Sequence, residues 1–500
     1  MTKLKLSGVS KAYGATLALR RGDLELDTGE VHVLIGANGS GKSTLCKIVA
    51  GSVRPDAGEV LLDGRAVTVS GPRAAQALGI GIFYQELSLA DHRSVAENIC
   101  LPDLPRKNGF FVDREALAEK ASRYIALFES VAGAELNTAA IVGDLRADQR
   151  QLVEIMKALA TEASILIFDE PTSALDRAQV DRFFEILRDL KEEGRSIVFI
   201  SHRMDEIFAI GDRVTVIRDG ETVGTEAIAD TSPEAVIHMM VGKQETLAAP
   251  QAAPPSQEAS HEIALTVESL TGVGFRDVNF AVRRGEILGL GGLHGQGQSA
   301  LLKALFGAPP ALAGQIELSG QPLRTENPRA AIAQGIAYVS GDRGRDGVIS
   351  GRPILENVTP IHALRDGLVL ARPTRLSEKA LPALKALNTK FAGLSHSIGS
   401  LSGGNQQKIV IARWLIDKPD ILLLDDPTKG IDLSAKADLF TLIRKLAKEG
   451  LAILLYSSED AELLNNADRI LVFNGGAVSR ELSGAERTRY NLYHAAYEAA

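Results

Sequence analysis

The sequence predicts an α/β protein made of two tandem copies of one fold, each an open, mostly parallel β-sheet with helices on both faces. The first observation behind this prediction is a set of short apolar runs that end in glycine or acidic residues, such as Val31–Ile35 and residues 165–168. Such runs are typical of buried parallel strands. The second is the amphipathic pattern between these runs, including residues 114–131, which predicts helices.

An internal repeat at one spacing predicts the duplication. Four landmarks of the two copies pair 256 positions apart: Gly36 with Gly292, Leu145 with Leu401, Asp169 with Asp425, and His202 with Ser458. A constant spacing implies the same fold twice, with few insertions between the landmarks. We therefore expect one domain over residues 1–242 and a second over residues 262–500.

Residues 243–261 separate the two copies and read KQETLAAPQAAPPSQEASH. Three prolines among Ala, Gln and Ser, with no hydrophobic periodicity, predict a solvated tether. Within the first copy, residues 86–149 lack a strand pattern and predict a helical subdomain. Near the C-terminus, Tyr490, Tyr493 and Tyr497 lie near one helical face and are expected to pack against the second copy.

The composition is that of an ordinary soluble globular protein, with 45% hydrophobic and 24% charged residues in 500. A net charge of −8 offers no basic surface for nucleic acid, so we expect no nucleic-acid partner. Cys46 and Cys100 lack metal-site or disulfide spacing and are expected to be buried and reduced. No apolar run approaches the roughly 20 residues of a membrane-spanning helix, and the N-terminus has no signal-peptide core. Any membrane span is therefore expected from other chains.

Residues 36–44 read GANGSGKST, a complete phosphate-binding pattern directly after the first buried strand. Its glycines let the backbone curl so that N–H groups point at phosphate oxygens, and a helix starting near Lys42 adds its partial positive charge. Lys42 is expected to reach the β and γ phosphates, and the Ser43 hydroxyl to ligate Mg²⁺. The nucleotide-binding residues predicted from this loop are Gly36, Ala37, Asn38, Gly39, Ser40, Gly41, Lys42, Ser43 and Thr44.

Two carboxylates, Asp169 and Glu170, end a buried strand at the same edge of the sheet as the loop. Asp169 is expected to hold Mg²⁺ through water, and Glu170 to polarise the attacking water as general base. By itself, a carboxylate pair after a strand more often caps a helix. The loop upstream and the PTSALD segment that follows favour the functional interpretation.

Three further residues have two interpretations each. Gln85 ends the apolar stretch of residues 80–84, where it can contact Mg²⁺ and the attacking water or be an ordinary polar residue at a strand end. His202 follows the apolar run of residues 197–200, a place where a lone histidine is usually structural. Tyr13 can stack on adenine or be an exposed aromatic residue in a hairpin.

Together these motifs resemble an ATPase of the ABC transporter family, and the resemblance covers essentially the whole chain, twice. The matching segments are the Walker A loop at residues 36–44, the Q-loop Gln85, the Walker B pair with Glu170, the D-loop at residues 173–176 and the switch His202. The resemblance implies two P-loop ABC ATPase domains, each with a mostly parallel sheet core, an antiparallel β part and a helical subdomain. It implies ATP and Mg²⁺ as cofactors, and it favours functional roles for Gln85, His202 and Tyr13.

ABC ATPases pair head to tail, so the resemblance implies that the signature loop of one copy covers the nucleotide held by the other. The second copy carries this signature intact at Leu401, Ser402, Gly403, Gly404, Asn405 and Gln406. Ser402 and the amides after it suit the γ-phosphate, helped by the helix that begins there. The first copy reads LRADQ at residues 145–149, without the serine and both glycines, and Asp148 there would repel phosphate.

The second copy's own phosphate loop, GLHGQGQSA at residues 292–300, is degenerate. The replacements are Gln298 for the loop lysine, Asp426 for the general base, Ser458 for the switch histidine and Ser340 near the Q-loop glutamine. The segment that carries Tyr13 is five residues shorter in the second copy, which predicts that the adenine platform is missing. Ser299 and Asp425 remain, so weak binding of Mg-nucleotide is still expected.

Head-to-tail pairing would put all the intact parts in one pocket and all the decayed parts in the other. Random decay would not sort the changes in this way. We therefore expect one hydrolytic site per chain, made of the first loop, the first carboxylates and the second signature. The other site is expected mainly to hold the interface.

Two classes of function remain: the energy-supplying subunit of a small-molecule importer, and a soluble tandem ATPase that acts on ribosomes or DNA. The soluble class usually keeps both sites complete and joins them by a long charged helix. This chain has a degenerate second site, a Pro/Ala tether and an acidic balance, which favour the importer.

Among importers, the sequence is similar to the fused monosaccharide-importer ATPases of bacteria, of the ribose, galactose and xylose types. The supporting residues are MMVGK at 239–243, DRGRDG at 342–347 and Asn405. That family usually has arginine at the position of Gln298, glutamate at that of Asp426, and LSVGQ at residues 145–149. Related ATPases import nucleosides or a signalling furanose, so these alternatives stay open.

The resemblance implies a complex with two permease subunits and a periplasmic or lipoprotein solute-binding protein. It places the chain at the cytoplasmic face of the bacterial inner membrane, as a peripheral subunit. ATP binding is expected to close the two copies and to pass this closure to permease helices beside Gln85. The solute does not touch this chain, so no motif in it identifies the solute.

Overall fold

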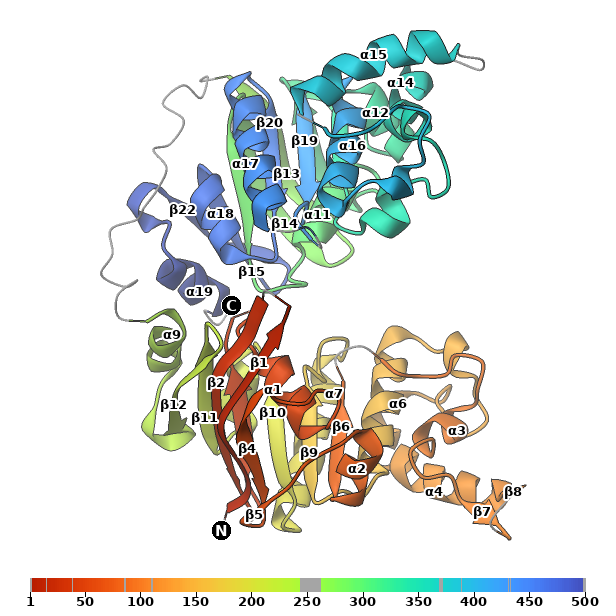
Figure 1. Cartoon of the computed structure of the whole chain (residues 1–500), viewed down its shortest axis with the longest axis vertical. Helices are drawn as coiled ribbons and strands as arrows, with labels where there is room; N and C mark the ends of the chain where they lie inside the picture. The colour runs from red at the N-terminus through yellow and green to blue at the C-terminus, as the bar shows by residue number, and fades with distance from the viewer. Residues whose placement is uncertain are drawn as a thin grey trace. The chain divides into compact units, whose positions relative to one another are not determined.

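The computed structural model of the chain divides into two compact units, Met1–Gly242 and Lys243–Ala500 (Figure 1). It describes residues 2–14, 16–37, 39–84, 87–108, 111–242, 262–367, 372–387, 389–429, 431 and 433–497. The tether predicted at residues 243–261 lies outside the described residues, as do Asn38 and Gln85.

The first unit is built around one ten-stranded sheet in the order β5-β4-β1-β2-β12-β11-β3-β10-β9-β6. The strands are β1 (Thr2–Tyr13), β2 (Thr16–Asp27), β3 (Val31–Ile35), β4 (Ala57–Leu62), β5 (Arg65–Ala66), β6 (Ile80–Phe83), β7 (Arg106–Lys107), β8 (Phe111–Val112), β9 (Ile165–Asp169), β10 (Ser196–Ile200), β11 (Arg213–Arg218) and β12 (Glu221–Ala227). The helices are α1 (Lys42–Val49), α2 (Pro72–Ala77), α3 (Val95–Ile99), α4 (Arg114–Ala126), α5 (Glu129–Ala132), α6 (Ala147–Leu159), α7 (Arg177–Glu192), α8 (Met204–Ile210) and α9 (Pro233–Val241).

The parallel half of this sheet runs from β11 through β3, β10 and β9 to β6, and β1, β2 and β4 form the antiparallel half. Every residue of β3, β9 and β10 is buried. Along β9, Leu166 and Phe168 pack toward α6 and α7, whereas Ile165 and Ile167 pack toward α1 and the β1–β2 hairpin. Because both faces are covered, these strands are apolar without alternation, which confirms the strands predicted at residues 31–35 and 165–168.

The helical subdomain predicted for residues 86–149 is present as α3, α4, α5 and the start of α6, with two differences. The helix expected over residues 114–131 ends at Ala126, and the short helix α5 follows it. A small ribbon of β7 and β8 lies in the stretch that was expected to lack strands. Asp113 begins α4 by accepting hydrogen bonds from the backbone N–H groups of Glu115 and Ala116, both at 3.2 Å.

The second unit repeats the architecture, with a six-stranded sheet in the order β18-β19-β20-β15-β21-β22 and a four-stranded sheet in the order β14-β13-β16-β17. The strands are β13 (Ile263–Gly272), β14 (Phe275–Arg283), β15 (Ile287–Gly292), β16 (Ala313–Leu318), β17 (Gln321–Pro322), β18 (Ile336–Val339), β19 (Ile421–Asp425), β20 (Ala452–Tyr456), β21 (Arg469–Asn474) and β22 (Ala477–Ser483). The helices are α11 (Gln298–Leu305), α12 (Pro328–Ala333), α13 (Ile354–Val358), α14 (Pro360–Arg365), α15 (Pro373–Ala386), α16 (Gly403–Leu415), α17 (Leu433–Lys448), α18 (Asp460–Asn466) and α19 (Arg489–Tyr497).

The first hairpin differs between the units. In the first unit, β1 and β2 pair out to Tyr13 and Thr16. In the second unit, β13 and β14 close at Gly272 and Phe275, the position that Lys11 and Leu19 hold in the first. The second hairpin therefore stops before it reaches a counterpart of Tyr13.

A buried polar cluster lies at the start of the parallel strands of the first unit. Arg213 Nε donates to Glu30 Oε1 at 2.6 Å, and His32 Nδ1 lies 3.0 Å from the same oxygen. Burial opposes ionisation of Glu30, but the hydrogen bonds from His32 and Arg213 lower its pKa to about 2. Glu286 and Arg469 repeat the ion pair at 2.6 Å in the second unit, at the same spacing of 256.

The C-terminal helix α19 packs on β15 and β21, as its tyrosines predict. Tyr493 is buried and donates its hydroxyl to Asp460 Oδ2 at 2.8 Å. Burial raises the pKa of both Asp460 and Tyr493, and their hydrogen bond lies inside the second unit.

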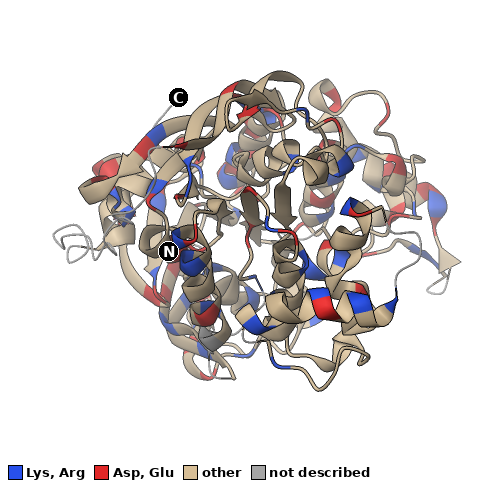
Figure 2. Ribbon diagram, turned by 90° about the horizontal axis from the view of Figure 1, so that it is seen from above, with Lys and Arg blue, Asp and Glu red and all other residues tan. Residues whose placement is uncertain are grey.

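Charged residues of both signs are interspersed along the ribbon in the view of Figure 2. Cys46 and Cys100 are free and buried, as expected. Burial raises the pKa of each thiol, which keeps both in the unreactive protonated form. Within the described ranges, no helix has the length and hydropathy needed to cross a bilayer.

Candidate nucleotide sites

The first phosphate loop is closed around the side chain of Lys42. β3 ends at Ile35 and α1 begins at Lys42, with Gly41 as its N-cap at φ 107°. A Cβ atom on Gly41 would lie 2.8 Å from the Ala18 carbonyl, so only glycine fits this turn. The buried Lys42 Nζ donates to the carbonyls of Gly36 at 2.7 Å and Ala37 at 3.0 Å.

The carboxylates of the first unit lie beside this loop. Asp169 is buried at the end of β9 and accepts a hydrogen bond from the Ser43 side chain. Burial, and next the charge of Glu170, raise the pKa of Asp169. Burial lowers the pKa of Lys42, and the charges of Glu170 and Asp169 oppose that shift. The structure thus brings a cation and two carboxylates together where the loop, α1 and β9 meet.

Glu170 has a left-handed backbone conformation, with φ at 54°. Its N–H donates to the Ile200 carbonyl at 3.0 Å, which ties it to the end of the neighbouring strand β10. His202, just past that strand, places Nδ1 3.3 Å from Glu170 Oε1. Left-handed backbone at a non-glycine residue costs free energy and occurs often at functional sites. The sequence placed Glu170 and His202 near the loop, and the structure adds that they contact each other.

The residues present fit a magnesium ion that is bound mainly by nucleotide and water. The Ser43 hydroxyl and the Asp169 carboxylate adjoin, and Mg²⁺ usually takes one or two protein oxygens together with substrate phosphates. The described residues hold no cluster of three or more His, Cys, Asp or Glu side chains that would form an all-protein site. Gln85, the third predicted metal contact, lies outside the described residues.

Tyr13 lies at the end of the β1–β2 hairpin with 47% of its surface exposed. The Lys11 ammonium group lies 6.0 Å from the centre of its ring. The ring is therefore accessible for stacking, as the sequence predicts for an adenine platform.

The signature segment of the second unit begins α16. Ser402 is the N-cap residue and is exposed, but its hydroxyl does not cap the helix; instead it accepts from Asn405 Nδ2 at 3.0 Å. Gln406 Nε2 donates to the carbonyl of Leu401, the residue before the N-cap, at 3.0 Å. The first turn of α16 is thus not covered by the serine hydroxyl, and its amides and helix dipole suit an anion.

Close helix packing explains the second glycine of the signature. A Cβ atom on Gly404 would lie 2.6 Å from the Ala435 Cβ on α17. In the first unit, Asp148 and Gln179 stand at these two positions, and Gln179 Nε2 donates to Asp148 Oδ2 at 3.0 Å. The first copy has therefore replaced a tight apolar contact by a hydrogen-bonded pair, a change that sequence inspection of the signature alone missed.

Asp148 is also paired with the residue that precedes α6. Arg146 donates to its two carboxylate oxygens at 3.2 and 3.1 Å, and to Glu135 at 2.8 Å. Burial raises the pKa of Asp148, but these hydrogen bonds and the one from Gln179 outweigh it and lower the pKa. The start of α6 thus carries a negative charge that is already paired within the first unit.

In the second phosphate loop, a glutamine keeps the geometry of the lysine without its charge. Gln298 is 1% exposed, and its Nε2 donates to the carbonyls of Gly291 at 3.1 Å and Leu293 at 3.0 Å. Leu293 is the counterpart of Ala37, so one of these bonds repeats a Lys42 bond, and the other goes to the residue before the counterpart of Gly36. The loop is therefore well formed but lacks the cation that compensates phosphate charge.

The carboxylates of the second unit are satisfied by hydroxyl groups. Asp425 accepts from Ser299 Oγ at 2.5 Å and from the Tyr338 hydroxyl at 2.6 Å, one on each oxygen. Asp426 Oδ1 accepts from both the N–H and the hydroxyl of Ser458 at 3.1 Å. This role of Tyr338 was not predicted from the sequence. The sequence signal that could have revealed it is a polar residue in a strand where the first copy has an apolar one.

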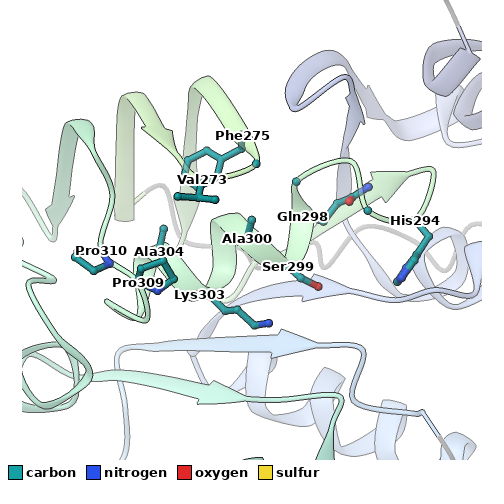
Figure 3. Close-up of a pocket in the computed structure, with 13 residues that line it drawn as sticks. Val273, Phe275, His294, Gln298, Ser299, Ala300, Lys303, Ala304, Pro309 and Pro310 are labelled. Carbon is teal, nitrogen blue, oxygen red and sulfur yellow. The ribbon is translucent and has the colours of Figure 1, made fainter. Parts of the chain in front are cut away.

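A cavity of about 390 Å³ lies against this second loop (Figure 3). Val273 and Phe275 come from the short hairpin, and Ser299 and Lys303 come from α11. The exposed residue at the turn is the aliphatic Val273, at 68%, whereas the aromatic Phe275 is only 3% exposed, so this hairpin presents no exposed aromatic ring like that of Tyr13.

The chain is similar to known proteins in three comparisons. The ABC transporter family pattern matches residues 19–173 and again residues 275–429. The putative ribose/galactose/methyl galactoside import ATP-binding protein 1 of Burkholderia lata is 44% identical over 98% of this chain and 95% of its own length. The ribose import ATP-binding protein RbsA 1 of Rubrobacter xylanophilus is 42% identical over 97% of this chain and 96% of its own length. Among solved structures, a dimeric bacterial ABC transporter cassette is 27% identical over 45% of this chain and 98% of its own, with a TM-score of 0.41.

Proposed function

This chain belongs to the ABC transporter family, and from that membership we propose that it hydrolyses ATP to drive import of a monosaccharide through separate permease subunits. The observation that carries the proposal is the difference between the two phosphate loops. The first holds Lys42 beside Asp169 and Glu170, whereas the second has the neutral Gln298 in place of the lysine, and both oxygens of its Asp425 accept hydroxyl groups, from Ser299 and Tyr338.

ATP binding is assigned to the first loop. Lys42 compensates the β and γ phosphates, the loop amides bind their oxygens, and Tyr13 stacks on adenine. Ser43 and Asp169 would hold the Mg²⁺ that accompanies ATP. When bound, that ion neutralises charge on the phosphate oxygens during transfer.

Glu170 is the general base in this proposal. It accepts a proton from the water that attacks the γ-phosphorus, while the bond from phosphorus to the β–γ bridging oxygen breaks and ADP leaves. His202 lies 3.3 Å from Glu170 and orients its carboxylate, and Gln85 contacts the attacking water. The products are ADP and inorganic phosphate.

The signature of the second unit completes this site in the proposal. Ser402 and the amides of Gly403 and Gly404 bind the γ-phosphate when the two units close head to tail. The second nucleotide site is then a scaffold, formed by the Gln298 loop and the first unit's Asp148 segment. Its carboxylates support this role, because both oxygens of Asp425 accept hydroxyl groups and Asp426 accepts twice from Ser458.

A monosaccharide is proposed as the solute because both reported relatives carry ribose or galactose in their names. The partners proposed are two permease subunits and a solute-binding protein, with the chain peripheral at the cytoplasmic face of the inner membrane. A soluble ATPase acting on ribosomes or DNA is not favoured by these relatives or by the net charge of −8.

The test compares Glu170→Gln with Asp426→Asn, two substitutions that remove one carboxylate charge at equivalent positions. ATP hydrolysis by the full chain is expected to fall at least about 100-fold in Glu170→Gln and less than twofold in Asp426→Asn. Equal losses would contradict the single hydrolytic site. Uptake of radiolabelled ribose or galactose into vesicles that contain the chain and its permease tests the solute class, and hydrolysis that no sugar stimulates would contradict it.

A further inference from the structure

The segment that follows β18 in the second unit is longer than its counterpart in the first. From Val339 to Ile354, the start of α13, it is three residues longer than the stretch from Phe83 to Val95, the start of α3. It contains a five-residue π-helix at Arg343–Gly347. Short π-helical turns are rare and frequently lie at functional sites.

One side chain of this π-helix reaches the signature itself. Arg343 Nη1 donates to the carbonyl of Gly403 at 3.1 Å. Gly403 is the first residue of α16 and directly follows Ser402. A Cβ atom on Gly347 would lie 3.4 Å both from the Arg343 stem and from Val410 of α16, so the π-helix packs closely on the signature helix.

A second arginine ties the same segment to α16 farther along the helix. Arg413 is 8% exposed, and it donates to the carbonyls of Gly347 at 2.8 Å and Asn357 at 2.6 Å. Burial lowers its pKa to about 10, so it stays charged at neutral pH. Arg343 and Arg413 therefore hold the segment at both ends of the signature helix.

The first unit has only part of this arrangement at the equivalent positions. Lys157 replaces Arg413 and donates to the carbonyl of Ser88 at 2.9 Å and to its hydroxyl at 2.7 Å. Counted from the end of the preceding strand, Leu87 stands where Arg343 stands, and leucine has no side-chain donor. The contact at the start of the helix therefore occurs in the copy with the intact signature.

The charge of Arg343 is informative because of where it lies. A cation near a helix N-terminus opposes the helix dipole and is unfavourable when nothing else binds there. The same cation strengthens the positive potential for an anion bound at the first turn. Its charge-assisted hydrogen bond also restrains the backbone next to Ser402.

We propose that Arg343 is a positioning residue for ATP hydrolysis, holding the start of α16 in register with the segment after β18 so that the signature meets the γ-phosphate. The inference rests on the proposed pairing of the second signature with the Lys42 loop. Arg343 acts through Gly403 and Ser402. It is used only when the units close, so its loss lowers kcat more than it weakens ATP binding.

The test uses the full chain and the pair Arg343→Met and Arg345→Met. Arg345 is 70% exposed and pairs with Asp346 at 2.8 Å within the π-helix, so its loss leaves the contact with α16 intact. We expect kcat to fall roughly tenfold in Arg343→Met, with KM for ATP changed less than twofold, and no change in Arg345→Met. Arg343→Lys, which can still donate to Gly403, should recover part of the loss.

Melting temperatures check that each variant is folded. If Arg343→Met does not fold, the kcat of Arg343→Gln is compared with that of Arg343→Lys. Glutamine shortens the side chain and removes its charge, so the role of Arg343 requires the lower kcat in Arg343→Gln. A folded Arg343→Met with wild-type kcat, or an equal loss in Arg345→Met, overturns the proposal. An increase in KM that matches the fall in kcat/KM overturns it as well, because that pattern indicates ground-state binding.

Ser402→Ala separates this inference from the function on which it rests. If Ser402→Ala keeps wild-type hydrolysis, the proposed pairing of signature and first loop fails, and the role of Arg343 fails with it. If Ser402→Ala loses activity and Arg343→Met does not, only the role of Arg343 is wrong. If both act through the same serine, the loss in the double variant is smaller than the product of the two single losses.

Discussion

The Tyr338 hydroxyl donates to Asp425 at 2.6 Å, across the neighbouring strands β18 and β19. In the first unit, Ile82 holds the equivalent position on β6 beside β9, which ends in Asp169. The Asp425 carboxylate is thus engaged on both oxygens by Tyr338 and Ser299, while Asp169 has an apolar neighbour on the β6 side. The two aspartates therefore have equivalent backbone positions but differ in one contact, the Tyr338 hydroxyl on Asp425.

Transferring this tyrosine to the first unit should impair its metal site. In Ile82→Tyr, the new hydroxyl is expected to donate to Asp169 and compete with Mg²⁺, lowering ATP hydrolysis about tenfold and raising the Mg²⁺ concentration needed for half-maximal rate. Ile82→Phe adds the same ring without the hydroxyl. The measurement is the hydrolysis rate across a Mg²⁺ titration, and equal losses in both variants would assign the effect to ring size.

The second loop predicts a variant of the first that folds but does not hydrolyse ATP. Gln298 shows that a glutamine amide can donate to two carbonyls of such a loop, so Lys42→Gln should keep the loop closed and the melting temperature within about 2 °C of wild type. Hydrolysis should fall at least about 100-fold, because the phosphate charge loses its cation. Lys42→Ala removes the loop bonds as well and should lower both quantities. A melting temperature of Lys42→Gln as low as that of Lys42→Ala would refute the loop-closing role.

The exchanged pair on α16 and α17 separates packing from catalysis. Gly404→Asp places a side chain against Ala435 and should cost about 2 kcal/mol of stability together with hydrolysis. Adding Ala435→Gln gives the second unit the counterpart of the Asp148–Gln179 pair. This double variant should recover most of the stability but none of the activity. Thermal unfolding and ATPase assays of both variants check this, and recovered hydrolysis in the double variant would show that the glycine serves packing alone.

Glu30 predicts an acid-sensitive core in the first unit. Hydrogen bonds lower its folded pKa from 4.5 to about 2, so its stabilisation is complete above pH 4.5 and is lost as the pH falls toward 2. The shift corresponds to about 3 kcal/mol. The protection factors of the β3 amides against hydrogen exchange should therefore fall over this range in wild type. In Glu30→Gln, the protection factors should be lower at neutral pH and less dependent on acid, whereas the exposed Glu59→Gln should behave as wild type.

Features that depend on neighbours in sequence were predictable. A strand, a glycine turn and a helix follow one another within residues 31–49, so the phosphate loop and the place of Lys42 were visible in the sequence, as were the repeat and the signature at Ser402. The longer helix expected over residues 114–131 failed at its end, where no strong stop signal occurs before Leu127. The ribbon of β7 and β8 was missed because each strand has only two residues.

What the sequence determined by itself is the duplication, the complete first loop and the changes in the second. Only the tertiary structure decided what those changes do, because the partners lie far apart in sequence. Tyr338 meets Asp425, Gln179 meets Asp148, and Arg343 meets Gly403. Each meeting depends on which strands and helices pack side by side. In the sequence, a substitution such as Gln298 looks like the loss of a functional residue. In the folded unit, Gln298 and its neighbours form a closed, hydrogen-bonded loop.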